Sequence, residues 1–152
     1  MTMTKILLFS GFLLLLSQCY NGLSRYISVC NNSDNPISWY MSFTHGIFYP
    51  DTTLPEKNPN PRKFDEISYF YFGEGLHENK VFAWLPTDTI SIFFFDPDTL
   101  AKYDWAIIRE EYKILVRYDL SHDNLRELKW CVCYPPTEAM QNMKMYPPYA
   151  TF

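Results

Sequence analysis

Glycine is scarce in this chain, and the glycine-containing motifs of common enzymes are missing. Only five of the 152 residues are glycine, whereas eleven are proline. No Gly-x-Ser-x-Gly nucleophile turn, glycine-rich phosphate loop or His-Glu-x-x-His zinc motif occurs. The lack of a motif does not exclude an enzyme, but it removes every positive reason to propose one.

Patterns typical of metal sites are also missing. Cys131 and Cys133 are separated by one residue, whereas zinc-binding cysteines usually have two residues between them. The chain contains three histidines, which lie in different segments and have no neighbour at ligand spacing: His45, His77 and His122. We therefore expect no metal and no other cofactor.

A hydrophobic run long enough to cross a membrane is lacking, and the longest one suits an export signal. Residues 6–16 are apolar except for Ser10 and Gly11, whereas a spanning helix needs roughly 20 apolar residues. Lys5 is the only charge before this run, and small or polar residues follow it. We therefore expect residues 1–19 to be a lipoprotein-like signal peptide that directs the protein out of the cytoplasm.

Cys19 ends this leader and has two interpretations. The order Leu16-Ser17-Gln18-Cys19 resembles a bacterial lipobox, whose cysteine is acylated, although a small residue normally stands where Gln18 lies. We favour lipidation, because a diacylated cysteine supplies the two chains that stable membrane anchoring needs. The protein would then be a periplasmic or outer-membrane lipoprotein. The alternative is ordinary cleavage, which leaves a secreted chain.

The charge balance argues against nucleic acid as a partner. Without the leader, which contains Lys5, 12 basic residues stand against 17 acidic ones, a net charge of −5. Nucleic acids select basic surfaces that displace phosphate counterions. The acidic balance also argues against a polybasic membrane contact, so any membrane contact would be made through the lipid anchor.

The body of the chain is typical of a small β-rich domain. Aromatic residues make up 18% of the sequence, and they favour strands. Alternating or apolar segments predict about seven strands, at 26–31, 37–43, 67–72, 80–85, 90–95, 113–119 and 130–134. We expect a small antiparallel β-sandwich over residues 20–136, in which the first two strands form a hairpin.

Three segments between and after these strands have other signatures. Residues 50–66 contain four prolines and predict a loop or an edge. Helix signals lie between the fifth and sixth strands: Asp96 can cap a helix with Pro97 at its first position, and Asp104 can restart it. Ser121 predicts a short helix before the last strand. Residues 137–152 show no period, and we expect a poorly ordered tail.

The cysteines of the body predict one sulfur pair at most. Cys30 points opposite Ile27 and Val29 on its strand, and Cys131 and Cys133 both point opposite Val132. If the first and last strands pair, Cys30 could bridge to Cys131 or to Cys133 in an oxidising compartment. The alternative is a set of buried free thiols.

Tyrosines suggest a surface that could bind sugar or peptide. Tyr69 and Tyr71 share one face of their strand, and Tyr49 could join them. A plain strand with phenylalanines inward and tyrosines outward explains the same pattern.

The block from residue 90 onward resembles a known group of proteins. Its specific part consists of the segments SIFFFD (91–96), DTLAKYDW (98–105), IREEY (108–112) and LVRYDLS (115–121). Leu125 and Leu128 follow, and Asn31-Asn32-Ser33 also fits. Residues 26–136 thus resemble a family of short, uncharacterised exported proteins, mostly lipoprotein-like, of Bacteroidota-type bacteria. The resemblance implies export and a compact domain but no activity.

These features favour an interaction protein over an enzyme. Our first hypothesis is an envelope-anchored or secreted, non-catalytic accessory module that binds a protein or glycan of the cell envelope. The alternative is a small envelope enzyme that acts on glycan or peptidoglycan through an unrecognised site. An enzyme should show a cleft with converging acids, histidines or cysteines, whereas a module should show a continuous aromatic or apolar patch.

Overall fold

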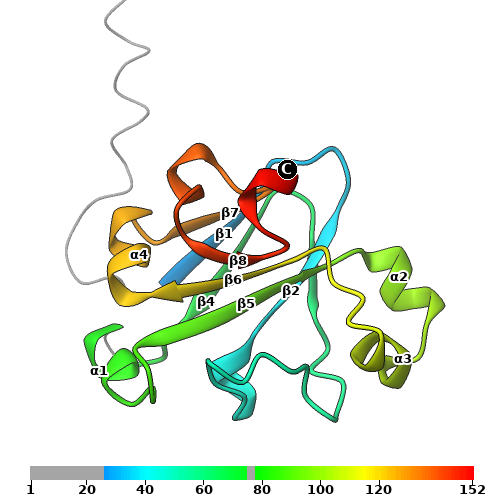
Figure 1. Ribbon diagram of the computed structural model, residues 1–152, viewed down its shortest axis with the longest axis horizontal. Helices are drawn as coiled ribbons and strands as arrows, with labels where there is room; N and C mark the ends of the chain where they lie inside the picture. The colour runs from blue at the N-terminus through cyan, green and yellow to red at the C-terminus, as the bar shows by residue number, and fades with distance from the viewer. Residues whose placement is uncertain (1–25, 75–77) are drawn as a thin grey trace, which may run out of the picture.

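The chain is mostly β, as its sequence predicts, in a computed structural model that describes residues 26–74 and 78–152 (Figure 1). Within these residues the structure contains eight strands: β1 (Tyr26–Asn31), β2 (Ile37–Met41), β3 (Arg62–Phe64), β4 (Ile67–Tyr71), β5 (Thr89–Phe95), β6 (Val116–Ser121), β7 (Cys131–Tyr134) and β8 (Lys144–Tyr146). The predicted leader, with Cys19, lies outside the described residues, so lipidation and signal cleavage stay predictions.

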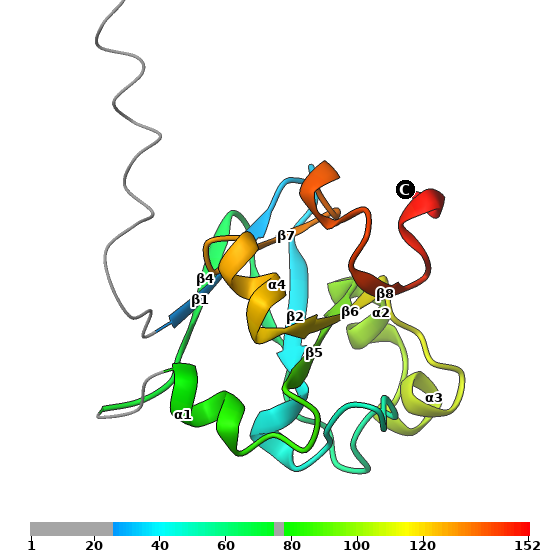
Figure 2. The same ribbon diagram turned by 60° about the vertical axis from the view of Figure 1, so that its left-hand side comes forward.

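The strands form two sheets that enclose one main hydrophobic core. The smaller sheet has the order β4-β1-β7 and the larger one β3-β2-β5-β6-β8. Figure 2 shows β4 and β1 on the left of the molecule and β6 and β8 on the right. Both sheets contribute fully buried side chains to the same cluster, among them Ile27, Val29, Val132, Ile92 and Phe94. Alternation along each strand therefore produces the predicted sandwich.

The predicted N-terminal hairpin is wrong, because β1 and β2 belong to different sheets. β1 pairs antiparallel with β4 and parallel with β7, whereas β2 pairs with β3 and β5. The connection between β1 and β2 crosses from one layer to the other. The side chain of Asn31 fixes it by donating to the carbonyl oxygens of Asn35 (2.7 Å) and Asp65 (2.8 Å).

The strand predicted at residues 80–85 is also wrong, since α1 (Glu78–Ala83) occupies this segment. Val81 and Phe82 are buried in the main core. The ring of Phe82 packs against His122 and Trp130 at centroid distances of 5.2 and 6.2 Å. A run this short contains too few residues to distinguish helical from strand periodicity. The packing of Val81 and Phe82 in the core, and not the local sequence pattern, therefore sets the helical conformation of this segment.

The predicted helical insertion between the fifth and sixth strands is confirmed. It consists of α2 (Pro97–Lys102) and α3 (Trp105–Glu110). Asp96 caps α2 by accepting from the backbone amides of Asp98 and Thr99, both at 3.1 Å. The bonds with Thr99 and with these amides hold the pKa of Asp96 below its usual value, against a smaller opposing effect of burial.

The predicted short helix before the last predicted strand is confirmed as α4 (His122–Glu127). Ser121 and Asn124 form a reciprocal capping box: the Ser121 hydroxyl accepts from the Asn124 amide, and the Asn124 side chain accepts from the Ser121 amide. Leu120 and Leu125 are fully buried beside this helix start. Side-chain caps thus fix the helix starts at Asp96 and Ser121, whereas Asp104 stands at the start of α3, as predicted, without a side-chain cap bond.

The tail is not poorly ordered, contrary to the prediction for residues 137–152. Short 3-10 helices span Glu138–Met140 and Tyr149–Thr151, and β8 between them pairs with β6. Met140 is fully buried and Met143 is 8% exposed in the main core. Methionine side chains fill irregular gaps, so they anchor this segment without leaving a periodic pattern.

A second, smaller cluster covers the outer face of the larger sheet. Ile108 of α3 and Leu54 of the proline-rich loop pack on Phe93, Phe95 and Tyr40. Through Ile108, α3 therefore packs on the outer face of β5. The proline-rich segment contributes only β3, an edge strand. None of the helices within the described ranges has the length and apolar content that a bilayer span requires.

Candidate functional site

The outer face of the smaller sheet presents exposed aromatic side chains. The register sets Tyr26 opposite Tyr71, Ser28 opposite Tyr69 and Cys30 opposite Ile67, and paired residues point to the same side. Ile27 and Val29 point inward and are fully buried. The tyrosine face is therefore defined by the outward residues of the three strands, which are Tyr26, Ser28, Cys30, Ile67, Tyr69, Tyr71, Cys131 and Cys133.

Three tyrosine rings and one isoleucine dominate this face. Tyr71 is 66% exposed, Ile67 47%, Tyr26 43% and Tyr69 39%. The Tyr26 ring lies 5.6 Å from that of Tyr69 and 5.8 Å from that of Tyr71. The three ring planes are mutually inclined, at 84°, 54° and 38°. The rings therefore form a ridged cluster and not a flat platform.

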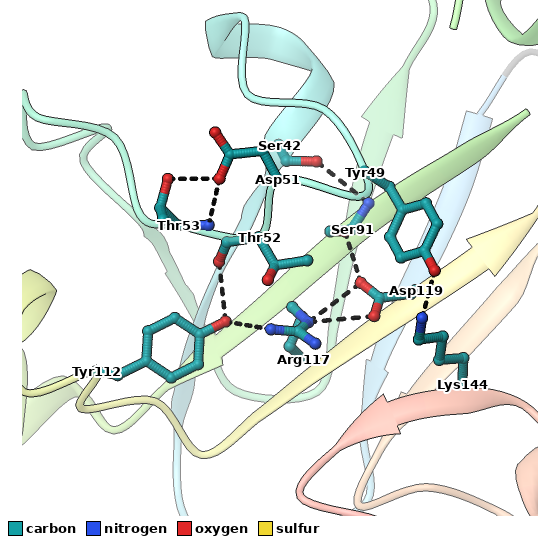
Figure 3. A network of polar contacts seen from close by, with 10 residues as sticks. All are labelled: Ser42, Tyr49, Asp51, Thr52, Thr53, Ser91, Tyr112, Arg117, Asp119 and Lys144. Atoms are coloured by element: carbon teal, nitrogen blue, oxygen red, sulfur yellow. Dashed lines mark hydrogen bonds and ion pairs between the residues drawn. The ribbon is translucent and has the colours of Figure 1, made fainter. Parts of the chain in front are cut away.

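Only two of the three tyrosines proposed from sequence belong to this cluster. Tyr49 lies beside the larger sheet instead, where its hydroxyl accepts from Lys144 of β8 (Figure 3). Tyr26 takes the third position. Alternation on β1 already pointed Tyr26 outward, but its place beside Tyr69 and Tyr71 depends on the pairing of β1 with β4, which is not a local signal.

The tyrosine face carries no charged side chain, although 20% of the chain is charged. Its eight positions are filled by tyrosine, isoleucine, serine and cysteine. Arg62 reaches the edge of β4, where its guanidinium donates to the Tyr69 carbonyl oxygen at 3.3 Å. Burial of this face against a partner would therefore remove apolar surface from water without stripping the solvent from an ion.

The three body cysteines meet on the same face. A disulfide joins Cys30 to Cys133, one of the two partners that the sequence allowed, and Cys131 is free and half-buried. The Cys131 Sγ lies 3.6 Å from the Cys30 Sγ, and the three sulfurs lie within 4.8 Å of one another. A soft metal ion needs thiolates, so this trio could hold one only after two-electron reduction of the disulfide.

The outer face of the larger sheet carries a buried polar network (Figure 3). The Asp119 carboxylate accepts from the Ser91 hydroxyl at 2.6 Å and from Nε of Arg117 at 3.1 Å. Arg117 also donates to the Tyr112 hydroxyl, which in turn donates to the carbonyl oxygen of Thr52 at 2.9 Å. This chain of bonds ties the proline-rich loop to β5 and β6.

A shallow hollow of about 310 Å³ lies beside this network. It is lined by Thr52, Thr53, Leu54, Arg109 and Tyr112. Arg109 Nε donates to the Leu54 carbonyl oxygen at 2.9 Å, so this guanidinium nitrogen already holds the loop. Burial raises the pKa of the Tyr112 hydroxyl, which favours its neutral form. The Arg109 and Tyr112 side chains that line the hollow thus hydrogen-bond to backbone carbonyls of the proline-rich loop. Ser91 and Asp119 of the neighbouring network are buried away from solvent.

In the described part of the chain, no histidine belongs to a group of side chains that could bind a metal ion. The ring of His122 packs against Phe82 and Trp130, at centroid distances of 5.2 and 5.6 Å. His77 and the side chain of His45 lie outside what the structure describes. The one group of metal-ligating side chains within the described ranges is the cysteine trio.

Comparison with known proteins identifies no relative of this chain. The chain matches no protein-family model, and neither the curated proteins nor the solved structures contain a match to it. The resemblance to exported lipoprotein-like proteins stays a prediction. The tyrosine face and the cysteines within it are the surface from which a function can be argued.

Proposed function

We propose that this chain is an exported, non-catalytic binding module that contacts another protein through its tyrosine face. The observation that carries the proposal is the cluster of exposed Tyr26, Tyr69, Tyr71 and Ile67 on an uncharged sheet surface. Tyrosine is enriched at protein interfaces, whereas lysine, glutamate and aspartate are depleted there. Contiguous exposed apolar patches on soluble domains commonly mark interaction sites.

A protein partner fits this face better than a glycan. Small-ligand sites combine apolar surface with several converging polar groups, and the outward residues of this face offer only tyrosine and serine hydroxyls, with no carboxylate or amide side chain. The ring planes are inclined by as much as 84°, which favours a ridged protein surface over a continuous sugar chain. Because complementary surfaces match in charge and this face is uncharged, we expect the partner to contact it through an uncharged, apolar surface.

The extent of the face indicates a modest affinity. Neighbouring strands lie about 4.8 Å apart and residues rise about 3.3 Å each, so three short strands present a few hundred Å² at most. A standard interface buries roughly 800 Å² on each partner. We expect the face to form the centre of an interface with a dissociation constant near the micromolar range, as suits a transient contact.

Export is supported by the cysteines as well as by the leader-like sequence. Disulfides persist in oxidising compartments and are rare in the cytosol. The Cys30–Cys133 bond joins the two paired strands β1 and β7 across 103 residues of sequence. A domain that depends on this link for part of its stability is suited to an exported protein.

Photo-crosslinking from the tyrosine face tests the proposal. A benzophenone amino acid replaces Tyr71 in the full chain, and a matched version replaces Phe152, an aromatic residue that is 51% exposed and lies outside the tyrosine face. We expect a discrete protein adduct from position 71 in intact cells and none from position 152. A double variant, Tyr69→Ala with Tyr71→Ala, should not capture that protein.

The other outcomes have definite meanings. Equal adducts from both positions would show a non-specific contact and would contradict the proposal. Retention of the wild-type chain, but not of the double variant, on purified envelope polysaccharide would replace the protein with a glycan. Circular dichroism of each variant separates loss of binding from loss of folding. Because the replaced side chains are exposed, we expect native spectra.

A further inference from the structure

The free thiol of Cys131 lies in contact with one end of the disulfide. Its Sγ is 3.6 Å from the Cys30 Sγ, although Cys30 is bonded to Cys133. Cys133 is directly opposite Cys30 in the parallel β1–β7 register, with a Cα–Cα distance of 4.5 Å, and Cys131 is opposite Ser28. Cys30 thus has one partner straight across the sheet and a second on the diagonal.

We propose that the three cysteines form a thiol–disulfide exchange site in which Cys131 and Cys133 compete for Cys30. The Cys131 thiolate attacks the Cys30 Sγ, the Cys30–Cys131 bond forms, and the Cys30–Cys133 bond breaks. Cys133 leaves as a thiolate and takes up the proton that Cys131 released. The total number of disulfides and thiols is unchanged, so no external oxidant or reductant is required.

The fold allows this step with little movement of the backbone. Cys131 and Cys133 point to the same side of β7, which is an edge strand of the smaller sheet. Because the third sulfur is already in contact with the bond, rotation of cysteine side chains is enough to align the attack. Cys131 is half-buried and not sealed in the core, so solvent and reagents can reach its sulfur.

The consequence is a free thiol that can appear at either of two positions on the tyrosine face. The two positions lie two residues apart along β7, about 6.6 Å. An alkylating reagent or an external disulfide would therefore react at Cys131 in one isomer and at Cys133 in the other. This inference is independent of the proposed binding function, because the exchange occurs within a single chain.

Site-resolved alkylation tests the exchange. The full chain is purified without reductant, incubated at pH 8 and treated with N-ethylmaleimide before denaturation in acid, where thiolates are too few to exchange. Fragment-ion mass spectrometry then assigns the label to Cys131 or Cys133. We expect label at both residues, and a disulfide at Cys30 in every molecule that is labelled at one of them.

Two variants make the result decisive. In Cys131→Ser the Cys30–Cys133 bond should persist, and neither Cys30 nor Cys133 should take up label. In Cys133→Ser the chain should form the Cys30–Cys131 bond during oxidative folding, which shows that the diagonal pair is within reach. Label confined to Cys131 in the wild type, or label at Cys133 no greater than in Cys131→Ser, would overturn the proposal. A Cys133→Ser chain in which Cys30 and Cys131 both stay free would do the same.

Discussion

Breaking the Arg117–Asp119 pair should be strongly destabilising, because the carboxylate left behind has no access to water. The side chain of Asp119 is fully buried and that of Arg117 is 13% exposed, and Nε of Arg117 lies 3.1 and 3.2 Å from the two carboxylate oxygens. Arg117→Met keeps the aliphatic stem but leaves the carboxylate with only the Ser91 hydroxyl. Removing one partner of a buried pair typically costs about 3–5 kcal/mol.

The reverse substitution should be milder. Asp119→Asn keeps the shape and can still accept from Ser91, and the guanidinium it leaves behind retains the Tyr112 hydroxyl and lies over the Tyr146 ring. We expect a loss of about 2 kcal/mol, because a hydrogen bond to a charged group contributes roughly 1.5–3 kcal/mol. The double variant should lose less than the sum of the two single losses, since it leaves no unpaired charge.

Urea unfolding of the four chains measures this coupling directly. Arg126→Met is the matched control, because its contact with Asp123 is exposed and 3.7 Å long, and it should change the unfolding free energy by less than about 0.5 kcal/mol. The slope of free energy against urea should stay constant. Strict additivity of the two substitutions, or an Arg117→Met loss as small as that of Arg126→Met, would refute the reasoning.

Three further predictions concern the cap, a strained residue and the disulfide. Asp96→Ala should lower stability by about 1 kcal/mol at pH 7. Because the folded-state pKa of Asp96 is depressed, that stabilisation is present above its ordinary value near 3.9 and lost as pH falls, so unfolding curves of the two chains should converge in acid. Lys129→Gly should raise the unfolding free energy by about 0.5–1 kcal/mol, since exposed Lys129 has φ 53° and glycine adopts this region without a steric penalty; an unchanged urea midpoint would contradict this. Cys30→Ser removes a cross-link between residues 103 apart and should cost about 4 kcal/mol in non-reducing urea unfolding, whereas a loss below 1 kcal/mol would show that the link adds little.

Local chemistry was readable from the sequence, and strand pairing was not. The caps at Asp96 and Ser121 depend on residues within three positions, so both helix starts were predicted correctly. Alternation placed Ile27 and Val29 on one face of their strand, opposite Cys30, and the structure buries that face. The partners of β1 lie far along the chain in β4 and β7, and the hairpin rule that joined β1 to β2 has no access to that information.

The candidate site was likewise predictable in its local parts and not in its assembly. Alternation put Tyr69 and Tyr71 on one face of their strand, and Cys131 and Cys133 on one face of theirs. The two pairs of residues come together only because β1 pairs with both β4 and β7. Tyr49 was assigned by residue type alone, without strand context, and it lies elsewhere. Segments whose structure is set by packing, such as α1 and the methionine-anchored tail, were missed because they have no period of their own.

The most direct test of the account is the affinity of the tyrosine face for the protein that crosslinking at Tyr71 identifies. Titration of that purified partner should give a dissociation constant at least roughly thirtyfold weaker for the Tyr69→Ala/Tyr71→Ala chain than for wild type, because two aromatic contacts contribute about 2 kcal/mol or more. Phe152→Ala should bind like wild type. Equal affinity for wild type and the double variant would show that the binding surface lies elsewhere on the molecule.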